Sequence, residues 1–411
     1  MNSERAQYVI VSQRYPPEKG GNASRIHDTA VNLTDEATAV TVLSPPPCYP
    51  PGNFPMSWQR CTRRDDEGVT VRRLWSWQPR RENPGLLSRS LYYLIFAFHA
   101  AVWILSNHRQ TDVVITSTPP ITTGIPGFAS ALLGIPWVVD VRDLWIENSV
   151  ALGYISEDSV LVRVSRRFQR LVLQTADRVT VTTQKLGGAI CETYGERLES
   201  KIRHIPNGVD CDLFRPMDIG SETPVRSGSG PTIVYTGNIG SAQALEPCIR
   251  AMEHVARDDV ELLLVGDGDE RSRLREVTDE LNLDGTVRFA GLVDREEVPA
   301  VINNAAVGLA PLRPTGELAY AMPTKVYEYL ACRVPIVVTG RGEIRRFVAN
   351  SGGGVHAETE PEAIATAIEA ALADQERENS MGTAGYHHVK SNYDRGQIAD
   401  TLREELTALT E

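Results

Sequence analysis

The sequence lacks the cysteine patterns that mark a zinc site or a disulfide framework. Its 411 residues include six cysteines, none of which forms a C-x-x-C pair or has zinc-ligand spacing to a histidine. Scattered single thiols of this kind fit a reducing compartment. We therefore expect a cytoplasmic protein without a metal site, whose cysteines serve as small apolar core residues.

An excess of positive charge is also missing. Lysine and arginine together number 42 against 53 acidic residues, which gives a formal net charge of −11 and a pI of about 5.4. Binding along nucleic acid needs an excess of cations to neutralise phosphates, so the composition argues against nucleic acid as a partner.

No hydrophobic run reaches the length of a membrane span. The N-terminus "MNSERAQYVIVSQ" contains only four consecutive apolar residues and predicts a first strand instead of a signal peptide. The longest apolar run, "LYYLIFAFHAAVWIL" at 91–105, has fifteen residues. A helix needs about 20 apolar residues to span a bilayer.

The segment before that run is nevertheless basic and aromatic. Residues 63–89 contain seven arginines against four acidic residues, with Trp75 and Trp77 among them. Arginine and tryptophan beside an apolar helix suit an anionic membrane surface. A core helix flanked by a solvated loop explains the same pattern without a membrane.

Short β-branched runs alternate with helical patterns through most of the chain. Helical stretches such as 270–282 and 362–374 separate many of the predicted strands, and this alternation predicts parallel sheets with helices on both faces. The predicted strands are 8–12, 40–43, 113–117, 136–141 and 178–182 in the first half and 232–236, 261–265, 286–290, 307–310 and 334–338 in the second.

The two halves predict two copies of one architecture. Between them lie "RHIPNGVDCDLFRP" at 203–216 and a Gly-, Ser- and Pro-rich stretch at 219–231, which reads as a linker or loop. The predicted fold class is α/β, with two doubly wound, Rossmann-like domains at 1–210 and 211–392 that face each other across a cleft. The amphipathic segment 393–411 predicts a last helix that crosses back to the first domain. Ligands of such sheets bind beyond the carboxyl ends of the strands.

The first strand-to-helix junction carries a glycine pair, Gly20 and Gly21. Glycines before a helix let a ligand approach the backbone, and the helix N-terminus attracts anions. A plain loop is an equal alternative for this pair.

The strand at 136–141 ends in a cluster of ionisable residues. Asp140, Arg142 and Asp143 stand at its carboxyl end, and Glu147 follows soon after. Such groups are costly to bury unless they are paired or functional. We interpret the cluster as catalytic, with a structural Arg–Asp pair as the alternative.

Three glycine loops follow strands in the second half. They contain Gly237, Asn238 and Gly240, then Gly266, then Gly291. Backbone N–H groups in such loops can hold a diphosphate. One Gly-x-Gly would be weak evidence, but three at successive strand ends line the same edge of one sheet.

A cation and an acid are predicted at that same edge. We expect Thr324 to cap a helix that begins near Lys325, which places Lys325 and Glu328 one turn apart on one face. The lysine can neutralise phosphate, and the glutamate can accept hydrogen bonds from two neighbouring sugar hydroxyls. An exposed Lys–Glu pair that only supports the helix is the alternative.

Eight stretches, in a fixed order, carry a family resemblance. They are "TSTPP", "DVRDLWIENSVALG", "ADRVTVTT", "IPNGVDCDLF", "YTGNIGSAQALE", "LLLVGDGDE", "VRFAGLV" and "PTKVYEYLACRVPIV". In them the chain resembles family-4 retaining glycosyltransferases of the GT-B fold over nearly its whole length. It looks like the subgroup that builds bacterial and archaeal surface polysaccharides, including N-acetyl-fucosamine transferases.

The resemblance implies a nucleotide-sugar co-substrate, UDP-linked and carrying an N-acetylated or deoxy hexose, in the second domain, with no other cofactor. Glu328 would grip the ribose, and Lys325 with the loop at 237–240 would face the diphosphate. Gly291 and Leu292 would lie near the base. The acceptor, a glycan or a polyprenyl-linked sugar, would bind the first domain. Such acceptors favour peripheral contact through 63–105 with the inner face of the cell membrane.

The resemblance further implies metal-independent transfer with retention. Arg142 stands near the reacting carbon, where many relatives carry a histidine. Asp143, Asp140 or Glu147 would orient or deprotonate the acceptor hydroxyl. Cations and backbone N–H groups would stabilise the departing diphosphate.

Two departures from the family pattern concern the donor. Tyr320 stands where many members carry a second glutamate, and Asn238 stands near the usual basic residues. Lys325 is then left with more of the phosphate charge, unless Arg288 faces the cleft and helps. A nucleotide-sugar epimerase of the same fold and a non-catalytic nucleotide-sugar-binding subunit are the alternative functions.

Overall fold

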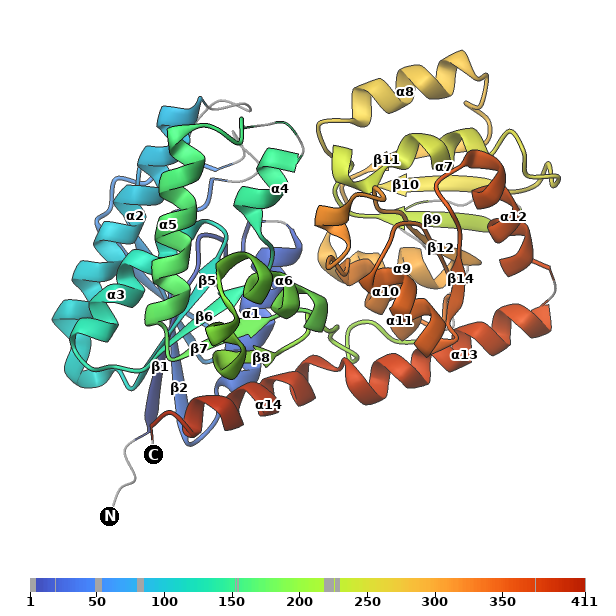
Figure 1. Ribbon diagram of the computed structural model, residues 1–411. Helices are drawn as coiled ribbons and strands as arrows, with labels where there is room; N and C mark the ends of the chain where they lie inside the picture. The colour runs from blue at the N-terminus through green and yellow to red at the C-terminus, as the bar shows by residue number, and fades with distance from the viewer. Residues whose placement is uncertain are drawn as a thin grey trace. The chain divides into compact units, whose positions relative to one another are not determined.

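The computed structural model describes residues 5–18, 20–48, 54–79, 85–151, 153, 155–217, 225, 230–373 and 375–410. The chain divides into two compact units, each with its own sheet (Figure 1). Unit 1 comprises Met1–Pro206 and Arg395–Glu411, and unit 2 comprises Asn207–Asp394. The predicted boundaries lie a few residues from these, after 210 and after 392.

Unit 1 is built on an eight-stranded sheet in the order β3-β4-β2-β1-β5-β6-β7-β8. Neighbouring strands pair in parallel, except that β3 runs antiparallel to β4. The strands are β1 (Ala6–Val11), β2 (Thr38–Ser44), β3 (Cys61–Asp66), β4 (Val69–Leu74), β5 (Val113–Thr118), β6 (Trp137–Val141), β7 (Arg178–Val181) and β8 (Ile202–His204).

The β3–β4 hairpin corrects the interpretation of the basic segment 63–89 as a solvated loop. Val69, Val71 and Leu74 of β4 are buried in the core, while β3 has the sequence CTRRDD and is mostly exposed. A charged edge strand resists pairing with other chains, and it also lacks the apolar periodicity by which strands are recognised. Arg80 and Arg81 of this segment lie outside the described residues.

Helices cover both faces of this sheet, as the alternating pattern predicts. The C-terminal helix packs with the first helix on one face, where Leu402 and Leu406 share a core with Ile26 and Leu33. The helices of unit 1 are α1 (Gly21–Leu33), α2 (Leu86–Asn107), α3 (Gly124–Leu132), α4 (Trp145–Ala151), α5 (Val160–Thr175), α6 (Gln184–Tyr194) and α14 (Arg395–Thr407). The predicted last helix at 393–411 is thus α14, which belongs to unit 1.

Helix α2 is longer than its apolar run. It has 22 residues, and by length and composition alone it is long and apolar enough to cross a membrane, which corrects the exclusion based on fifteen residues. A third (33%) of its most apolar window is buried. Tyr92, Phe96, Ala100 and Ile104, each four residues from the next, are buried. The face of α2 that carries these four residues therefore packs in the core of unit 1.

Unit 2 is built on a parallel six-stranded sheet in the order β11-β10-β9-β12-β13-β14. The strands are β9 (Thr232–Thr236), β10 (Glu261–Val265), β11 (Val287–Gly291), β12 (Val307–Ala310), β13 (Ile336–Val338) and β14 (Gly354–His356). The helices are α7 (Leu245–Ala251), α8 (Arg271–Glu280), α9 (Val298–Asn303), α10 (Thr324–Ala331), α11 (Glu343–Ser351), α12 (Pro361–Ala371) and α13 (Gln375–Asn392). The five strands predicted for this half are all present.

Candidate functional site

Helix α10 presents the predicted cation and acid at the carboxyl edge of the sheet in unit 2. The helix begins at Thr324, and Pro323 occupies the cap position without a capping side chain. The prediction that Thr324 caps the helix is therefore wrong by one residue, because Pro323 already supplies the extended backbone that precedes the first turn.

Tyr329 fixes α10 on the sheet. Its hydroxyl accepts a hydrogen bond from the backbone N–H of Thr236 at 2.8 Å. Its ring lies over Gly308, where a Cβ would come within 2.3 Å of the ring. A glycine in β12 thus lets a tyrosine of α10 reach the end of β9, and this contact sets the position of the residues one turn earlier.

The side chain of Lys325 is half-buried beside the first glycine loop. Its Nζ lies 3.8 Å from the ring centroid of Tyr235, and a Cβ at Gly237 would lie 3.3 Å from it. Lys325 has no ion pair in the part of the chain that the structure describes. Burial lowers the pKa of Lys325 to about 7, partly opposed by Glu328. A cation without a counter-ion is available to an anionic ligand.

Glu328 is half-buried on the same helix. Burial raises the pKa of its carboxyl, while Arg295 and Lys325 oppose the rise. Arg295 comes from the 3-10 turn η5 (Arg295–Glu297), which no sequence motif marked. Glu328 therefore remains an acceptor that is only partly compensated by cations, as recognition of ligand hydroxyls requires.

The glycine loops bond to one another through their backbones. Gly237 donates its N–H to the carbonyl of Val265 at 2.8 Å, and Gly266 donates to Gly291 at 2.7 Å. A Cβ at Gly266 would lie 1.9 Å from the carbonyl oxygen of Gly237, so only glycine fits there. The N–H groups of Gly237 and Gly266 are thus already used, and these glycines serve the close approach of the loops.

The rest of the first loop is held tightly. The hydroxyl of Tyr235 donates to the carbonyl of Asn238, and a Cβ at Gly240 would lie 2.5 Å from Nδ2 of Asn238. Next to it, the buried Oε1 of Gln243 has no hydrogen-bond partner among the described residues. A ligand that donates a hydrogen bond would satisfy this atom.

Leu292 and Arg288, the two other residues predicted to contact the donor, lie at different places in unit 2. Leu292 follows Gly291 and is 51% exposed, which leaves an apolar surface at the end of β11. Arg288, by contrast, pairs with Glu261 at 2.6 Å. Glu261 begins β10 while Gly266 follows its end, about 16 Å away at the rise of an extended strand. Arg288 is therefore not beside Lys325.

In unit 1, Asp140 is committed to a buried network. Arg25 Nη2 donates to Oδ1 at 3.0 Å, Arg142 Nε donates to Oδ2 at 3.1 Å, and Thr180 and Ser117 also donate to the carboxylate. Burial raises the pKa of Asp140, but the two guanidinium groups and the hydrogen bonds from Thr180 and Ser117 together lower it, and the net shift is downward. This part of the cluster is the structural Arg–Asp pair that stood as the alternative.

The glycine pair stands at the start of the helix that carries Arg25. Gly20 precedes α1 with φ +133 and no side-chain cap, and Gly21 is the first residue of the helix. One turn later α1 brings Arg25 to Asp140. Nothing in the sequence pattern marked Arg25, because its neighbours read only as an amphipathic helix.

Asp143 has a different environment. Its Oδ1 is buried and has no hydrogen-bond partner among the residues described. Burial raises the pKa of Asp143 to about 6, and Arg142 only partly opposes this. Burial and Arg25 in turn lower the pKa of Arg142 to about 9. Asp143 is thus a carboxylate able to take up a proton near neutral pH.

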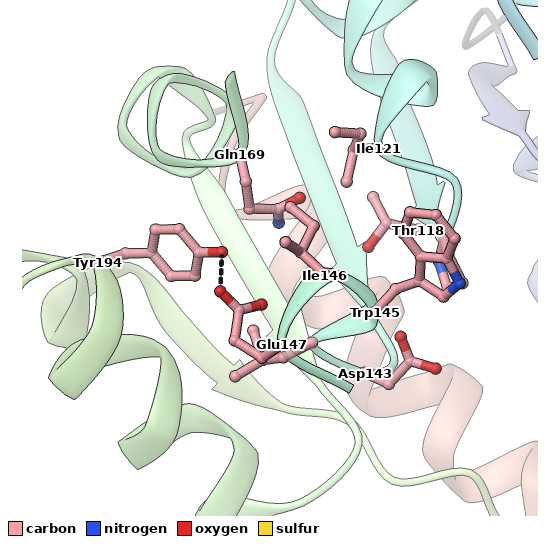
Figure 2. Close-up of a pocket in the computed structure, with 10 residues that line it drawn as sticks. Thr118, Ile121, Asp143, Trp145, Ile146, Glu147, Gln169 and Tyr194 are labelled. Atoms are coloured by element: carbon pink, nitrogen blue, oxygen red, sulfur yellow. Dashed lines mark hydrogen bonds between the residues drawn. The ribbon is translucent and has the colours of Figure 1, made fainter. Parts of the chain in front are cut away.

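Asp143 lines a shallow hollow that opens to solvent (Figure 2). Glu147 lies across it, and its Oε1 accepts a hydrogen bond from the hydroxyl of Tyr194 at 2.9 Å. The hollow is lined by Thr118, Pro119, Ile121, Asp143, Leu144, Trp145, Ile146, Glu147, Gln169 and Tyr194. These residues come from β5, α4, α5, α6 and the turns that follow β5 and β6.

Unpartnered polar atoms gather along this carboxyl edge. In the described part of unit 1, buried side-chain atoms without hydrogen-bond partners include Gln13 Oε1 and Nε2, Asn22 Oδ1, Thr118 Oγ1, Thr122 Oγ1, Arg142 Nη2, Asp143 Oδ1 and Glu147 Oε2. All these residues follow β1, β5 or β6, or end β5. Each such group costs about 1–3 kcal/mol unless a ligand or water satisfies it, so a ligand that bonds to these atoms would be stabilised at this edge. Buried atoms without a hydrogen-bond partner also occur elsewhere in the described part of unit 1, at Arg178, Arg395 and Arg403.

A metal-binding cluster is not among these features. Within the described ranges, no group of three or more His, Cys, Asp and Glu side chains is placed to hold a metal ion.

Two family models match the two units in turn. Residues 20–208 match the family described as glycosyl transferase 4-like domain, and residues 230–374 match the family described as glycosyl transferases group 1. The first match covers the strands of unit 1 from β2 to β8 but not β1, and the second covers β9 to β14 of unit 2.

Individual relatives and solved structures agree with the family models. A protein described as "Probable glycosyltransferase WbjE", from Pseudomonas aeruginosa, is 26% identical over 283 residues, 67% of this chain and 70% of that protein. A GDP-mannose-dependent alpha-(1-6)-phosphatidylinositol monomannoside mannosyltransferase of Mycolicibacterium smegmatis is 30% identical over 241 residues, 57% of this chain and 63% of that protein. The Anabaena protein HepE, in complex with UDP and glucose, shares the fold with a TM-score of 0.72 at 15% identity, over 98% of this chain and 100% of that one.

Proposed function

This chain is a glycosyltransferase of the GT-B type that uses a nucleotide sugar, and on that premise we propose a donor, an acceptor and a set of roles. The donor is a UDP-linked N-acetylated or deoxy hexose, bound at the carboxyl edge of unit 2. The acceptor is a glycan or a polyprenyl-linked sugar, bound at the carboxyl edge of unit 1, and transfer proceeds with retention and without a metal. The chain belongs by this proposal to the surface-polysaccharide subgroup.

The main support for the donor site is that Lys325 has no ion pair among the described residues. A half-buried ammonium with no ion pair in the described part of the chain is costly to hold, and its lowered pKa of about 7 records that cost. A diphosphate beside Gly237 would restore the charge. As the bond to the sugar breaks, negative charge grows on the leaving diphosphate, and Lys325 stabilises it at that moment.

The remaining donor contacts follow from the surroundings of Lys325. Glu328 accepts hydrogen bonds from the ribose hydroxyls, one helical turn beyond the phosphate. The exposed Leu292 supplies the apolar surface against which the base packs. Gln243 Oε1, which has no partner among the described residues, accepts a hydrogen bond from the donor.

Among the three acids of unit 1, we assign the acceptor base to Asp143. Asp140 is held by two arginines, and its pKa is lowered. One oxygen of Glu147 is engaged by Tyr194 and Arg166. Asp143 has a raised pKa of about 6 and lines the hollow, so it can accept the proton of a bound hydroxyl at neutral pH. Arg142, through its free Nη2 in the described structure, stabilises charge near the reacting carbon.

Unit 1 also offers a surface for a lipid-linked acceptor. Helix α2 exposes an apolar stripe with a spacing of three to four residues, which consists of Leu87, Leu91, Leu94, Phe98, Val102 and Leu105. Helix α5 contains four arginines and no acid, and it packs on α3, which packs on α2. An apolar stripe near a basic helix suits an anionic bilayer, so we assign peripheral contact on the cytoplasmic side to these helices.

The arginines of the segment 63–89 contribute less to this surface than the sequence suggests. Arg73 turns inward and donates to Ser44 Oγ at 2.8 Å, and Arg72 lies over the ring of Trp103. We expect L94E/F98E to abolish flotation with phosphatidylglycerol-containing liposomes. The matched control M217E alters an exposed apolar residue of unit 2 and should float like the wild type. Flotation of L94E/F98E at the wild-type level would contradict the assignment.

The donor assignment is tested by thermal shift with UDP, GDP and UMP. UDP should stabilise the wild type and the control K390A but not K325A, because Lys390 is exposed on α13. Stabilisation by GDP alone would show that the base is guanine, as in the mycobacterial relative. Equal stabilisation of K325A by UDP would remove the donor site from α10.

Product analysis separates transfer from the alternative functions. The relatives named above join sugars to acceptors, so they give the epimerase alternative no support. Incubation with the donor alone should leave its sugar unchanged, whereas an epimerase would convert it. A single-turnover assay with acceptor should release UDP, and a non-catalytic binding subunit would release none.

A further inference from the structure

The hollow of unit 1 has one wall that the proposed chemistry leaves unused, the indole of Trp145. We propose that Trp145 is a stacking platform for a sugar ring of the acceptor, and that the neighbouring polar atoms bind its hydroxyls. Figure 2 shows the indole beside Thr118, with the carboxylate of Asp143 near it. The inference rests on the function proposed above and specifies what enters the hollow.

The exposure of Trp145 is not required by the packing of α4. Its neighbours Leu144 and Ile146 are 5% and 3% exposed and supply the buried face of this segment, whereas Trp145 is 43% exposed. A large aromatic surface left open beside a polar hollow is what a stacking ligand covers. One face of a pyranose ring presents C–H groups, which pack against the face of an indole.

The polar atoms of the hollow match the rim of such a ring. Thr118 Oγ1, Asp143 Oδ1 and Glu147 Oε2 are buried and without hydrogen-bond partners in the described part of the chain. Glu147 is held in place through its other oxygen by Tyr194, at 2.9 Å. Sugar hydroxyls donate and accept, so they satisfy both carboxylates and the threonine, while the ring itself lies on Trp145.

The charge and polarity of the hollow disfavour the phosphate group and the alkyl chain of a lipid-linked acceptor. The described lining of the hollow contains two carboxylates, Asp143 and Glu147, and no lysine or arginine, so a phosphate group would find no cationic partner in the wall. An alkyl chain would leave the same polar atoms unsatisfied and buried, at a cost for each. A neutral sugar ring avoids both penalties, and the phosphate of a lipid-linked acceptor must lie outside the hollow.

Binding of methyl glycosides to the full chain tests the inference. The probes are the methyl glycosides of glucose, galactose, fucose and N-acetylglucosamine, measured by saturation-transfer NMR with UDP present. At least one probe should bind the wild type through the C–H groups of one ring face. W145A should weaken this binding roughly tenfold or more, and W145F should restore part of it. The control W58A removes a tryptophan of unit 1 that is more exposed (69%) and does not line the hollow, and it should bind as the wild type does.

Thr118→Val provides a second test that separates ligand binding from folding. Because Oγ1 of Thr118 has no partner among the described residues, the variant should melt at the wild-type temperature or above. It should nevertheless bind the glycoside several-fold more weakly. A loss of stability with unchanged affinity would show that the hydroxyl is structural.

Failure of this inference is distinct from failure of the proposed function. If no probe binds the wild type, or if W145A binds as tightly as the wild type, the stacking platform is wrong. In either case, stabilisation of the same samples by UDP would leave the donor site intact. Absence of that stabilisation would overturn the proposed function itself.

Discussion

The carboxyl edges of the two sheets are built from different groups. In unit 1 the edge consists of side chains, and several of these are buried without partners in the described structure. In unit 2 the loops at the edge hydrogen-bond to one another, so that Gly237 and Gly266 no longer offer their N–H groups. Single substitutions can change which groups an edge made of unsatisfied side chains binds, whereas an edge of interlocked backbone keeps a fixed shape and leaves charge recognition to a side chain such as Lys325.

The largest effect on activity is expected from removing the charge of Asp143, at the carboxyl edge of unit 1. Asp143→Asn should lower kcat by about 10²–10⁴, because the hydroxyl loses its proton acceptor. The rise of the wild-type rate with pH, centred near the pKa of about 6, should disappear in the variant. Steady-state rates from pH 5 to 8 measure both, and a variant with an unchanged pH profile would exclude Asp143 as the base.

The same variant should be more stable than the wild type. The folded-state pKa of Asp143 lies above its usual value of 3.8, so the fold favours the protonated form and loses stability as pH rises from about 4 to 6. At pH 8 the neutral amide should therefore gain about 1–3 kcal/mol, and near pH 4 the difference should vanish. Thermal melts at the two pH values are the control for misfolding.

A smaller loss of activity is expected from Glu328→Gln, at the carboxyl edge of unit 2. The amide keeps the shape but accepts weaker hydrogen bonds from the ribose, so the KM for the donor should rise about 10–100-fold with less change in kcat. Binding of UDP should weaken in parallel, while binding of inorganic diphosphate should not. Equal weakening of both ligands would place Glu328 at the phosphates instead.

Lys325 gives a signature of ligand binding that needs no mutation. With a pKa of about 7 in the free protein, most of the lysine is neutral at pH 8, and a bound diphosphate should return it to the charged state. Binding of UDP at pH 8 should therefore take up close to one proton, and at pH 6 close to none. Calorimetry in two buffers of different ionisation enthalpy measures the uptake, which K325A should lack.

The smallest effect is expected from Tyr329→Phe, which leaves every ligand contact in place. Loss of the hydrogen bond to Thr236 should cost about 1 kcal/mol of stability and loosen α10 against the sheet. The KM for the donor should rise several-fold at most. If the KM rises while the melting temperature stays constant, the hydroxyl contacts the donor directly and does not only position the helix.

All ten predicted strands are present, because short β-branched runs of four to six residues favour strands over helices. Parallel pairing then brings the carboxyl ends of these strands together. Four strands were not predicted, namely β3, β4, β8 and β14. The charges of β3 suit an edge but carry no periodicity, and β8 and β14 have only three residues each. Arg25 pairs with Asp140, and Arg295 lies near enough to Glu328 to lower its pKa, through tertiary packing that leaves no trace in local sequence. The choice among Asp140, Asp143 and Glu147 likewise depends on partners from α1, α5 and α6, which spacing along the chain does not reveal.

The return of α14 to unit 1 has a consequence for how such chains can be recombined. Because unit 2 begins after Pro206 and ends at Asp394, it is an insertion within unit 1 and not an appended module. Exchanging it for the corresponding unit of a related protein requires two junctions, and the graft must keep the pair of Asp28 and Arg395 that ties the final helix to α1. A chimera cut only once, after residue 206, would lose α14 and expose the part of the core that Leu402 and Leu406 share with α1.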